Sequence, residues 1–212
     1  MLFGIQASRD IKLSEIARSL SEDIKLIKTA NRLSRNLQDE TMYPEINKQL
    51  INECKVKIDD NTVLALDLTD ISKPYAKKMA FLSSVWDGMN KKLTHGYWVL
   101  EVVGANVYKD YIYPLYSELY SQSADDFESE NKKILSAIDT VNNRLNGKGV
   151  WVMDRGGDRR TLIRKLTSKC LKFIIRIGFK RSLILYAVSC GEDNRVALAK
   201  EIVSNLDCSC RY

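Results

Sequence analysis

The chain has 212 residues, of which 45% are apolar and 28% charged. This is the composition of an ordinary globular protein, and with only ten glycines and three prolines it excludes collagen-like and low-complexity chains. We expect no signal peptide, because the first residues lack a basic segment followed by an apolar one. No membrane span is expected either, because every apolar run is far shorter than the ~20 residues that cross a bilayer.

The cysteines and the charges are both unevenly distributed. Five scattered cysteines predict reduced thiols of the cytoplasm, with Cys208 and Cys210 as an alternative but incomplete metal pair. The net charge is +6, whereas residues 151–212 alone carry +7, with thirteen basic against six acidic side chains. A basic segment beside a neutral one favours a surface that faces phosphate. A solvated charged face is the alternative.

Apolar residues spaced by threes and fours predict helix over residues 12–37, with a turn near residues 19–21 that divides it in two. The apolar stripe includes Ile24 and Ile27. Four cations share the other face of the second helix: Lys25, Lys28, Arg32 and Arg35. A short helix, a turn and a basic helix are typical of a helix-turn-helix, whose second helix enters the DNA major groove. An ordinary amphipathic helix pair is the alternative.

The rest of the chain alternates between strands and helices. The apolar patterns predict strands at 63–66, 97–103, 107–113 (ended by Pro114), 150–153, 171–177 and 182–186, and helices at 129–146, 159–168 and 195–206. This order predicts an α/β fold, a mixed sheet flanked by helices, after a small helical N-terminal segment. We place the division between the two at residue 60.

Two predicted strands run directly into an aspartate, Asp67 in one case and Asp154 in the other. Ligands gather at strand ends in α/β sheets, so the two carboxylates would converge if these strands are parallel neighbours. Carboxylates without His or Cys partners make an oxygen-only site suited to Mg²⁺ or Mn²⁺. Two such ions support phosphodiester chemistry. The alternative is that each aspartate caps a turn.

At these residues the sequence resembles a known family. The segment LALDLTDISKP (64–74) resembles the first catalytic block of DDE transposases from bacterial insertion sequences of the type-four group. The segment WVMDRGGD (151–158) resembles the second block. Further segments are similar to other parts of these proteins: 13–37 to the helical segment that binds DNA ends, and 86–88, 96–98 and 173–176 to the surroundings of the catalytic blocks.

The resemblance implies an RNase H-like fold that cuts element ends with two metal ions, held by two aspartates and a glutamate, and joins the freed 3′-hydroxyl to target DNA. Asp67 and Asp154 would be the two aspartates, with Asp70 and Asp158 close by. The block that carries the glutamate is not found. Glu192 and Glu201 lack its expected neighbours, and Glu201 is the substitute we consider. We therefore expect a C-terminally truncated transposase with little activity alone.

The resemblance also implies partners and an arrangement. Residues 1–60 would bind DNA ends, and 61–212 would be an incomplete catalytic domain. Cations near the two blocks would contact the phosphates of double-stranded DNA: Lys73, Arg155, Arg159 and Arg160. A homodimer at the nucleoid, in the cytoplasm, is expected. The alternative is a DNA-binding remnant or inhibitor without chemistry. A phosphatase is disfavoured, because two residues rather than one separate Asp67 from Asp70.

Overall fold

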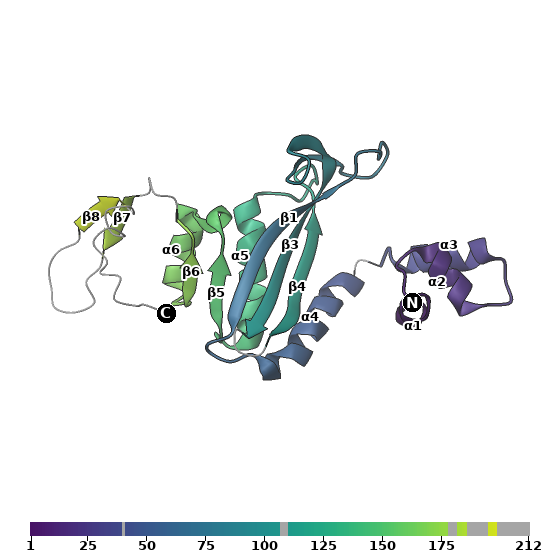
Figure 1. Ribbon diagram of the computed structural model, residues 1–212, viewed down its shortest axis with the longest axis horizontal. Helices are drawn as coiled ribbons and strands as arrows, with labels where there is room; N and C mark the ends of the chain where they lie inside the picture. Colours follow the sequence, from purple (N-terminus) through teal and green to yellow (C-terminus); the bar gives the residue numbers. More distant parts are fainter. Residues whose placement is uncertain (40, 107–109, 178–181, 186–194, 199–212) are drawn as a thin grey trace. The chain divides into compact units, whose positions relative to one another are not determined.

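The computed structural model describes the chain except residues 40, 107–109, 178–181, 186–194 and 199–212 (Figure 1). Its internal contacts divide it into two units, Met1–Gln49 and Leu50–Tyr212. The expected division at residue 60 falls a little beyond this one. Within the described residues, no helix combines the length and the apolar character that crossing a membrane requires.

The first unit is helical. Its helices are α1 (Leu2–Ser8), α2 (Leu13–Leu20), α3 (Leu26–Asn36) and the beginning of α4 (Met42–Cys54). A small core of Ile16, Ala17 and Leu33 joins α2 to α3. Gly4 allows α1 to approach closely, because a Cβ there would lie 2.5 Å from the Ile16 side chain. Two short helices with a turn between them, as the sequence predicts, are therefore present.

The turn between α2 and α3 is stabilised by Glu22. Its carboxylate accepts a hydrogen bond from the Thr29 hydroxyl at 2.9 Å and pairs with Arg32. The predicted apolar stripe is wrong at this turn, because Ile24 and Ile27 are exposed. The reason is that α3 buries its opposite face, through Thr29 and Leu33, and the two isoleucines lie off that face.

The second unit contains a six-stranded mixed sheet. The strands are β1 (Val63–Ser72), β2 (Ser83–Asp87), β3 (Lys92–Asn106), β4 (Tyr111–Tyr120), β5 (Val150–Met153) and β6 (Phe173–Ile175). The order is β2-β3-β1-β5-β6, and β4 also pairs with β3. β3 is antiparallel to β1, β2 and β4, whereas β1, β5 and β6 are parallel. The predicted mixed sheet is thus confirmed.

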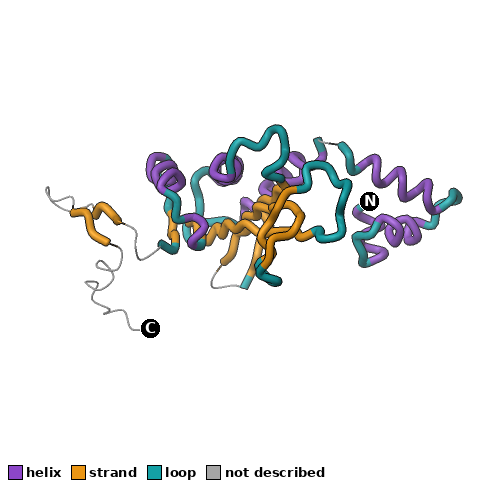
Figure 2. The backbone as a smooth tube through the Cα atoms, turned by 90° about the horizontal axis from the view of Figure 1, so that it is seen from above, coloured by secondary structure: helices purple, strands orange, loops and turns teal. Residues whose placement is uncertain are grey.

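Three helices cover one face of this sheet: the end of α4, α5 (Glu130–Leu145) and α6 (Arg160–Ser168). Figure 2 shows helices on one side of the strands. Alternate residues of β1 and β5 form the buried layer beneath them, with Leu64 opposite Trp151 and Leu66 opposite Met153. The helix α5 begins at its Ser129 cap, whose side chain accepts from the Lys132 amide, and it confirms the helix predicted at 129–146.

Two strand boundaries differ from the prediction. The strand that contains Asp67 does not end there but continues to Ser72, because β3 pairs with it along its whole length. Pro114 does not end a strand but lies within β4, beside a register shift between Val102 and Val103 of β3. Proline is tolerated there because β4 is an edge strand with an irregular ladder.

The predicted final helix, 195–206, is wrong over its first residues. Residues Arg195–Leu198 form β8, which pairs antiparallel with β7 (Ser182–Leu185). A cross-strand partner satisfies the backbone hydrogen bonds of this short segment and overrides its helical spacing. Residues 199–206 of that predicted helix lie outside the described residues.

Candidate active-site cleft

A cleft of about 290 Å³ opens where β5 ends and β1 continues. The parallel pairing stops at Leu66 and Met153, so the next residue of each strand is an aspartate, Asp67 or Asp154. Both aspartates line the cleft. The sequence hypothesis required the two strands to be parallel neighbours, and the structure fulfils that condition.

Each aspartate is oriented by a backbone amide. Asp67 accepts a hydrogen bond from the Leu68 amide at 2.9 Å. Asp154 caps the 3₁₀ turn Arg155–Gly157 and accepts from the Gly156 amide at 2.6 Å. In each aspartate, one carboxylate oxygen accepts a hydrogen bond from the neighbouring backbone. Both residues are exposed, so they stay accessible from the cleft.

Arg159 ties the turn that carries Asp154 to the start of α5. Its Nε donates to the Gly156 carbonyl at 2.7 Å and one terminal nitrogen to Asn131 Oδ1 at 3.0 Å. The other terminal nitrogen pairs with Glu130. A planar guanidinium suits such divergent acceptors, since its donors are fixed in direction. All three of its nitrogens are therefore engaged within the protein.

The donor set fits a hard divalent cation in part. The acidic side chains that line the cleft are Asp67, Asp154 and Glu130, and Mg²⁺ is commonly bound by one or two carboxylates together with water and phosphate oxygens. Among the described residues, however, no three His, Cys, Asp or Glu side chains are grouped to hold a metal. Glu192 and Glu201 lie outside those residues.

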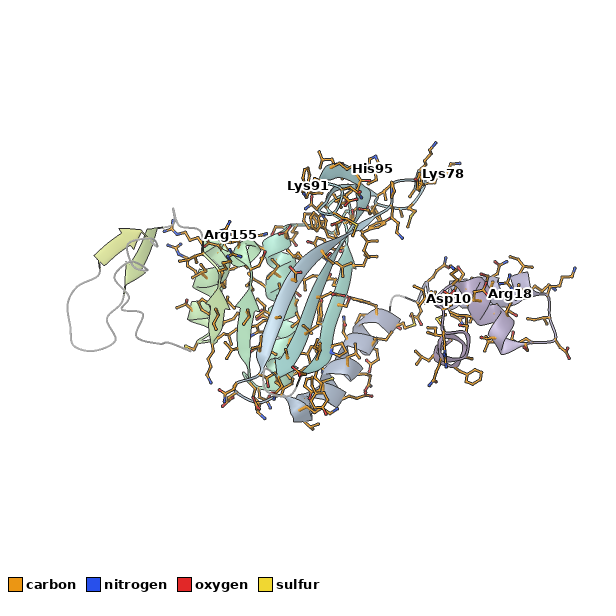
Figure 3. The ribbon with its side chains drawn as sticks, viewed as in Figure 1. Asp10, Arg18, Lys78, Lys91, His95 and Arg155 are labelled. Atoms are coloured by element: carbon orange, nitrogen blue, oxygen red, sulfur yellow. The ribbon has the colours of Figure 1, made fainter. Side chains whose placement is uncertain are left out.

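The other predicted site residues are dispersed. Arg155 and Arg160 are exposed beside the cleft, and Lys73 follows β1 directly. In Figure 3, Arg155 lies at the end of β5. In the first unit, the four predicted cations of α3 and its N-cap are all exposed, and one of them, Arg32, is paired with Glu22.

Sequence reasoning missed Glu130 and Trp98, which also line the cleft. The indole Nε1 of Trp98 is buried and has no hydrogen-bond partner among the described residues. Burial also raises the pKa of the nearby Tyr120 phenol, and the charge of Glu130 adds to this rise. Glu130 could have been noted as an acid in the first turn of a predicted helix. Nothing in the sequence, however, indicates that this turn lies at the same cleft as Asp154.

No family model matches this chain. No curated protein matches it either. Among solved structures, the chain is similar to the piggyBac transposase in its synaptic complex with hairpin DNA, with 13% identity and a TM-score of 0.44, covering 82% of this chain and 39% of that one. It is also similar to the Mos1 strand transfer complex, with 13% identity and a TM-score of 0.30, covering 80% of this chain and 54% of that one.

Proposed function

We propose that this protein binds DNA and cuts phosphodiester bonds in it as a transposase of the DDE type. The observation that carries the proposal is that Asp67 and Asp154, distant in the sequence, follow directly on the last paired residues of two parallel strands and line one cleft. The two sequence blocks that resemble those of DDE transposases meet at this point. A mixed sheet agrees with the RNase H-like fold that the resemblance implies.

The residues in and around the cleft would have separate roles. Asp67 and Asp154 would hold the divalent cations, Mg²⁺ or Mn²⁺, which activate a water or 3′-hydroxyl and stabilise the leaving oxygen. Arg159 would hold the turn of Asp154 against α5 and so act as a positioning residue. Arg155, Arg160 and Lys73 would contact phosphates on either side.

The finer assignment follows from the sequence blocks. We propose that the DNA substrate is the end of a bacterial insertion sequence, that residues 1–60 recognise it, and that two copies of the chain act together at the nucleoid. The cations Lys25, Lys28, Arg32 and Arg35 would supply phosphate contacts in that first segment. A third carboxylate is still required, and Glu201 is the candidate carried by the sequence.

The test is Mn²⁺-dependent nicking of supercoiled plasmid by the purified chain. We expect nicking to be lost in Asp67→Asn and Asp154→Asn, which remove the charge but keep the shape. The matched control is Asp139→Asn, which removes a partly exposed carboxylate of α5 that pairs only with Lys169 in the described structure. Equal nicking by Asp154→Asn and the control would refute a catalytic cleft.

A second function is favoured by the incomplete metal set among the described residues. The chain would then bind DNA without cutting it and would act as a remnant or inhibitor. No nicking together with a salt-sensitive gel shift would identify this function. Neutralising the four cations at α3 would then lower the salt dependence, while Asp154→Asn would leave binding unchanged.

A further inference from the structure

The segment between β1 and the middle of β3, residues 73–95, forms a basic arm that is fastened to the sheet. It leaves β1 at Lys73, whose amide donates to the His95 carbonyl at 2.6 Å. The Tyr97 hydroxyl donates to the Ala80 carbonyl at 2.6 Å, and the Ser121 hydroxyl donates to the Phe81 carbonyl. The basic arm is therefore a built part of the second unit, and Figure 3 shows Lys78, Lys91 and His95 on it.

The hairpin of β2 and β3 within the basic arm exposes one apolar face. Trp86 lies directly opposite Leu93, and they are 52% and 71% exposed. The alternate position, Val85, is buried, so the pleat turns Trp86 and Leu93 to the outside. Tyr75 in the preceding loop is 94% exposed. Neighbouring exposed apolar side chains such as Trp86 and Leu93 are a feature of interaction sites.

A groove of about 620 Å³ runs along the same segment. It lies between the loop that follows β1 and His95 of β3. Apolar, aromatic and basic side chains line it, among them Lys77, Met79 and Phe81. A groove with an aromatic wall and a cation at its rim has the features that hold an unstacked base beside its phosphate.

The charge of the basic arm is one-sided. It carries five lysines, Lys73, Lys77, Lys78, Lys91 and Lys92, against a single acid, Asp87. Within the described part of the chain none of these lysines forms a salt bridge. The Asp87 carboxylate is buried and accepts from the side chain and amide of Asn90. The lysine charge is thus available to an anionic partner.

The basic arm lies where a DNA strand that passes through the cleft could reach it. Lys73 follows Asp67 by six residues along one extended strand, which corresponds to about 20 Å. That length equals roughly six nucleotides at 3.4 Å per step. A DNA strand with one phosphate at Asp67 would therefore reach the basic arm without bending.

We infer that the basic arm is a second DNA-binding surface, in which the lysines contact phosphates and Phe81, Trp86 and Tyr75 contact unstacked bases. The polymer is DNA rather than an acidic membrane because the groove and the exposed rings provide for stacking, which lipid head groups do not use. The location of the strand rests on the proposed function, whereas binding by the basic arm does not require cutting.

The first experiment measures the salt dependence of binding to a labelled duplex with a single-stranded overhang. Lys77, Lys78 and Lys91 are changed together to Ala, and the control changes Lys55, Lys57 and Lys148, which are also exposed, to Ala. We expect the slope of log K against log salt to fall by about 2 to 3 in the first variant, at 0.7–0.9 per contact. The control should retain the slope.

The second experiment follows tryptophan fluorescence on addition of the same DNA. Trp86 is the exposed tryptophan of the three, whereas Trp151 is 1% exposed. We expect most of the quenching to disappear in Trp86→Leu and to remain in Trp151→Phe, because the Trp151 ring is buried and out of reach of DNA. Circular dichroism checks that each variant is folded, and Lys78→Ala alone replaces the triple variant if that one is not.

The outcomes separate this inference from the proposed function. Equal slopes in the triple variant and its control, or unchanged quenching in Trp86→Leu, would overturn the inference even if Asp154→Asn abolishes nicking. Loss of slope and quenching without any nicking would support the basic arm and refute cleavage. Binding of anionic vesicles in preference to DNA would also overturn the inference, in favour of a membrane surface.

Discussion

Replacing Arg159 by Ala should destabilise the second unit and disable the cleft. The change removes the hydrogen bonds to Gly156 and Asn131 and leaves the Glu130 carboxylate, whose side chain is 21% exposed, without its cation. Hydrogen bonds to charged groups contribute about 1.5–3 kcal/mol when buried. Because the Arg159 side chain is itself 32% exposed, solvent screens part of these interactions. We therefore expect the substitution to lower the free energy of unfolding by about 2–3 kcal/mol in all.

The assay is urea and thermal denaturation followed by fluorescence. For a unit of this size, about 2–3 kcal/mol lowers Tm by about 4–12 °C. The control is Arg160→Ala, an exposed neighbour, which should stay within about 0.5 kcal/mol of the parent. Arg159→Lys should restore part of the nicking, and DNA affinity should not change. Equal stability of Arg159→Ala and Arg160→Ala would refute the positioning role.

Three further predictions concern stability. Ile138→Ala should cost about 2–5 kcal/mol in urea denaturation, since this side chain is fully buried in α5, and Ile174→Ala, at an exposed position, should cost little; similar losses would contradict the assigned core. Ser129→Ala should cost about 1 kcal/mol through loss of the α5 cap, measured in the same way. An unchanged stability would show that the Ser129 side chain does not stabilise α5. Hydrogen bonds from Asn90 hold the pKa of Asp87 below its ordinary value of 3.8, so the stability they add is present above about pH 4 and lost as the pH falls further; urea midpoints should therefore drop more steeply with acid in the parent than in Asp87→Asn, and parallel pH profiles would count against this.

Local patterns made some elements predictable. α5 combines a capping serine, Ser129, with an apolar stripe that includes Ile134, Ile138 and Val141, and both signals act within one turn or two. β5 is equally local, as a short apolar run after a glycine turn. Such elements depend on neighbouring residues alone, so the sequence suffices for them.

The elements that were missed depend on partners far along the chain. β2 was not predicted, because its strand is fixed by pairing with β3 and only three of its five residues are buried. Residues 195–198 have helical spacing, yet they pair with β7 as an antiparallel strand. Tertiary context outweighs weak local preference at both places.

The candidate site divides in the same way. Asp67 and Asp154 could be found because each follows an apolar run, and the structure brings both to one cleft. The place of Glu130 in the cleft and the contacts of Arg159 with α5 could not be predicted, because the approach of α5 to the turn after β5 is set by packing between helix and sheet. The sequence suggested Arg159 only as a phosphate contact, since its acceptors are distant in the chain.

The pairing of β1 with β5 also bears on how the protein is made. β1 and β3 are complete once residue 106 has left the ribosome, but β5 begins only at residue 150. Until then the edge of β1 at Val63–Leu66 has no partner, and an unpaired apolar edge is a template for other chains. A nascent or broken chain that stops between these points would therefore aggregate through β1. The four residues of β5 that bring Asp154 to the same cleft as Asp67 are also those that close this edge.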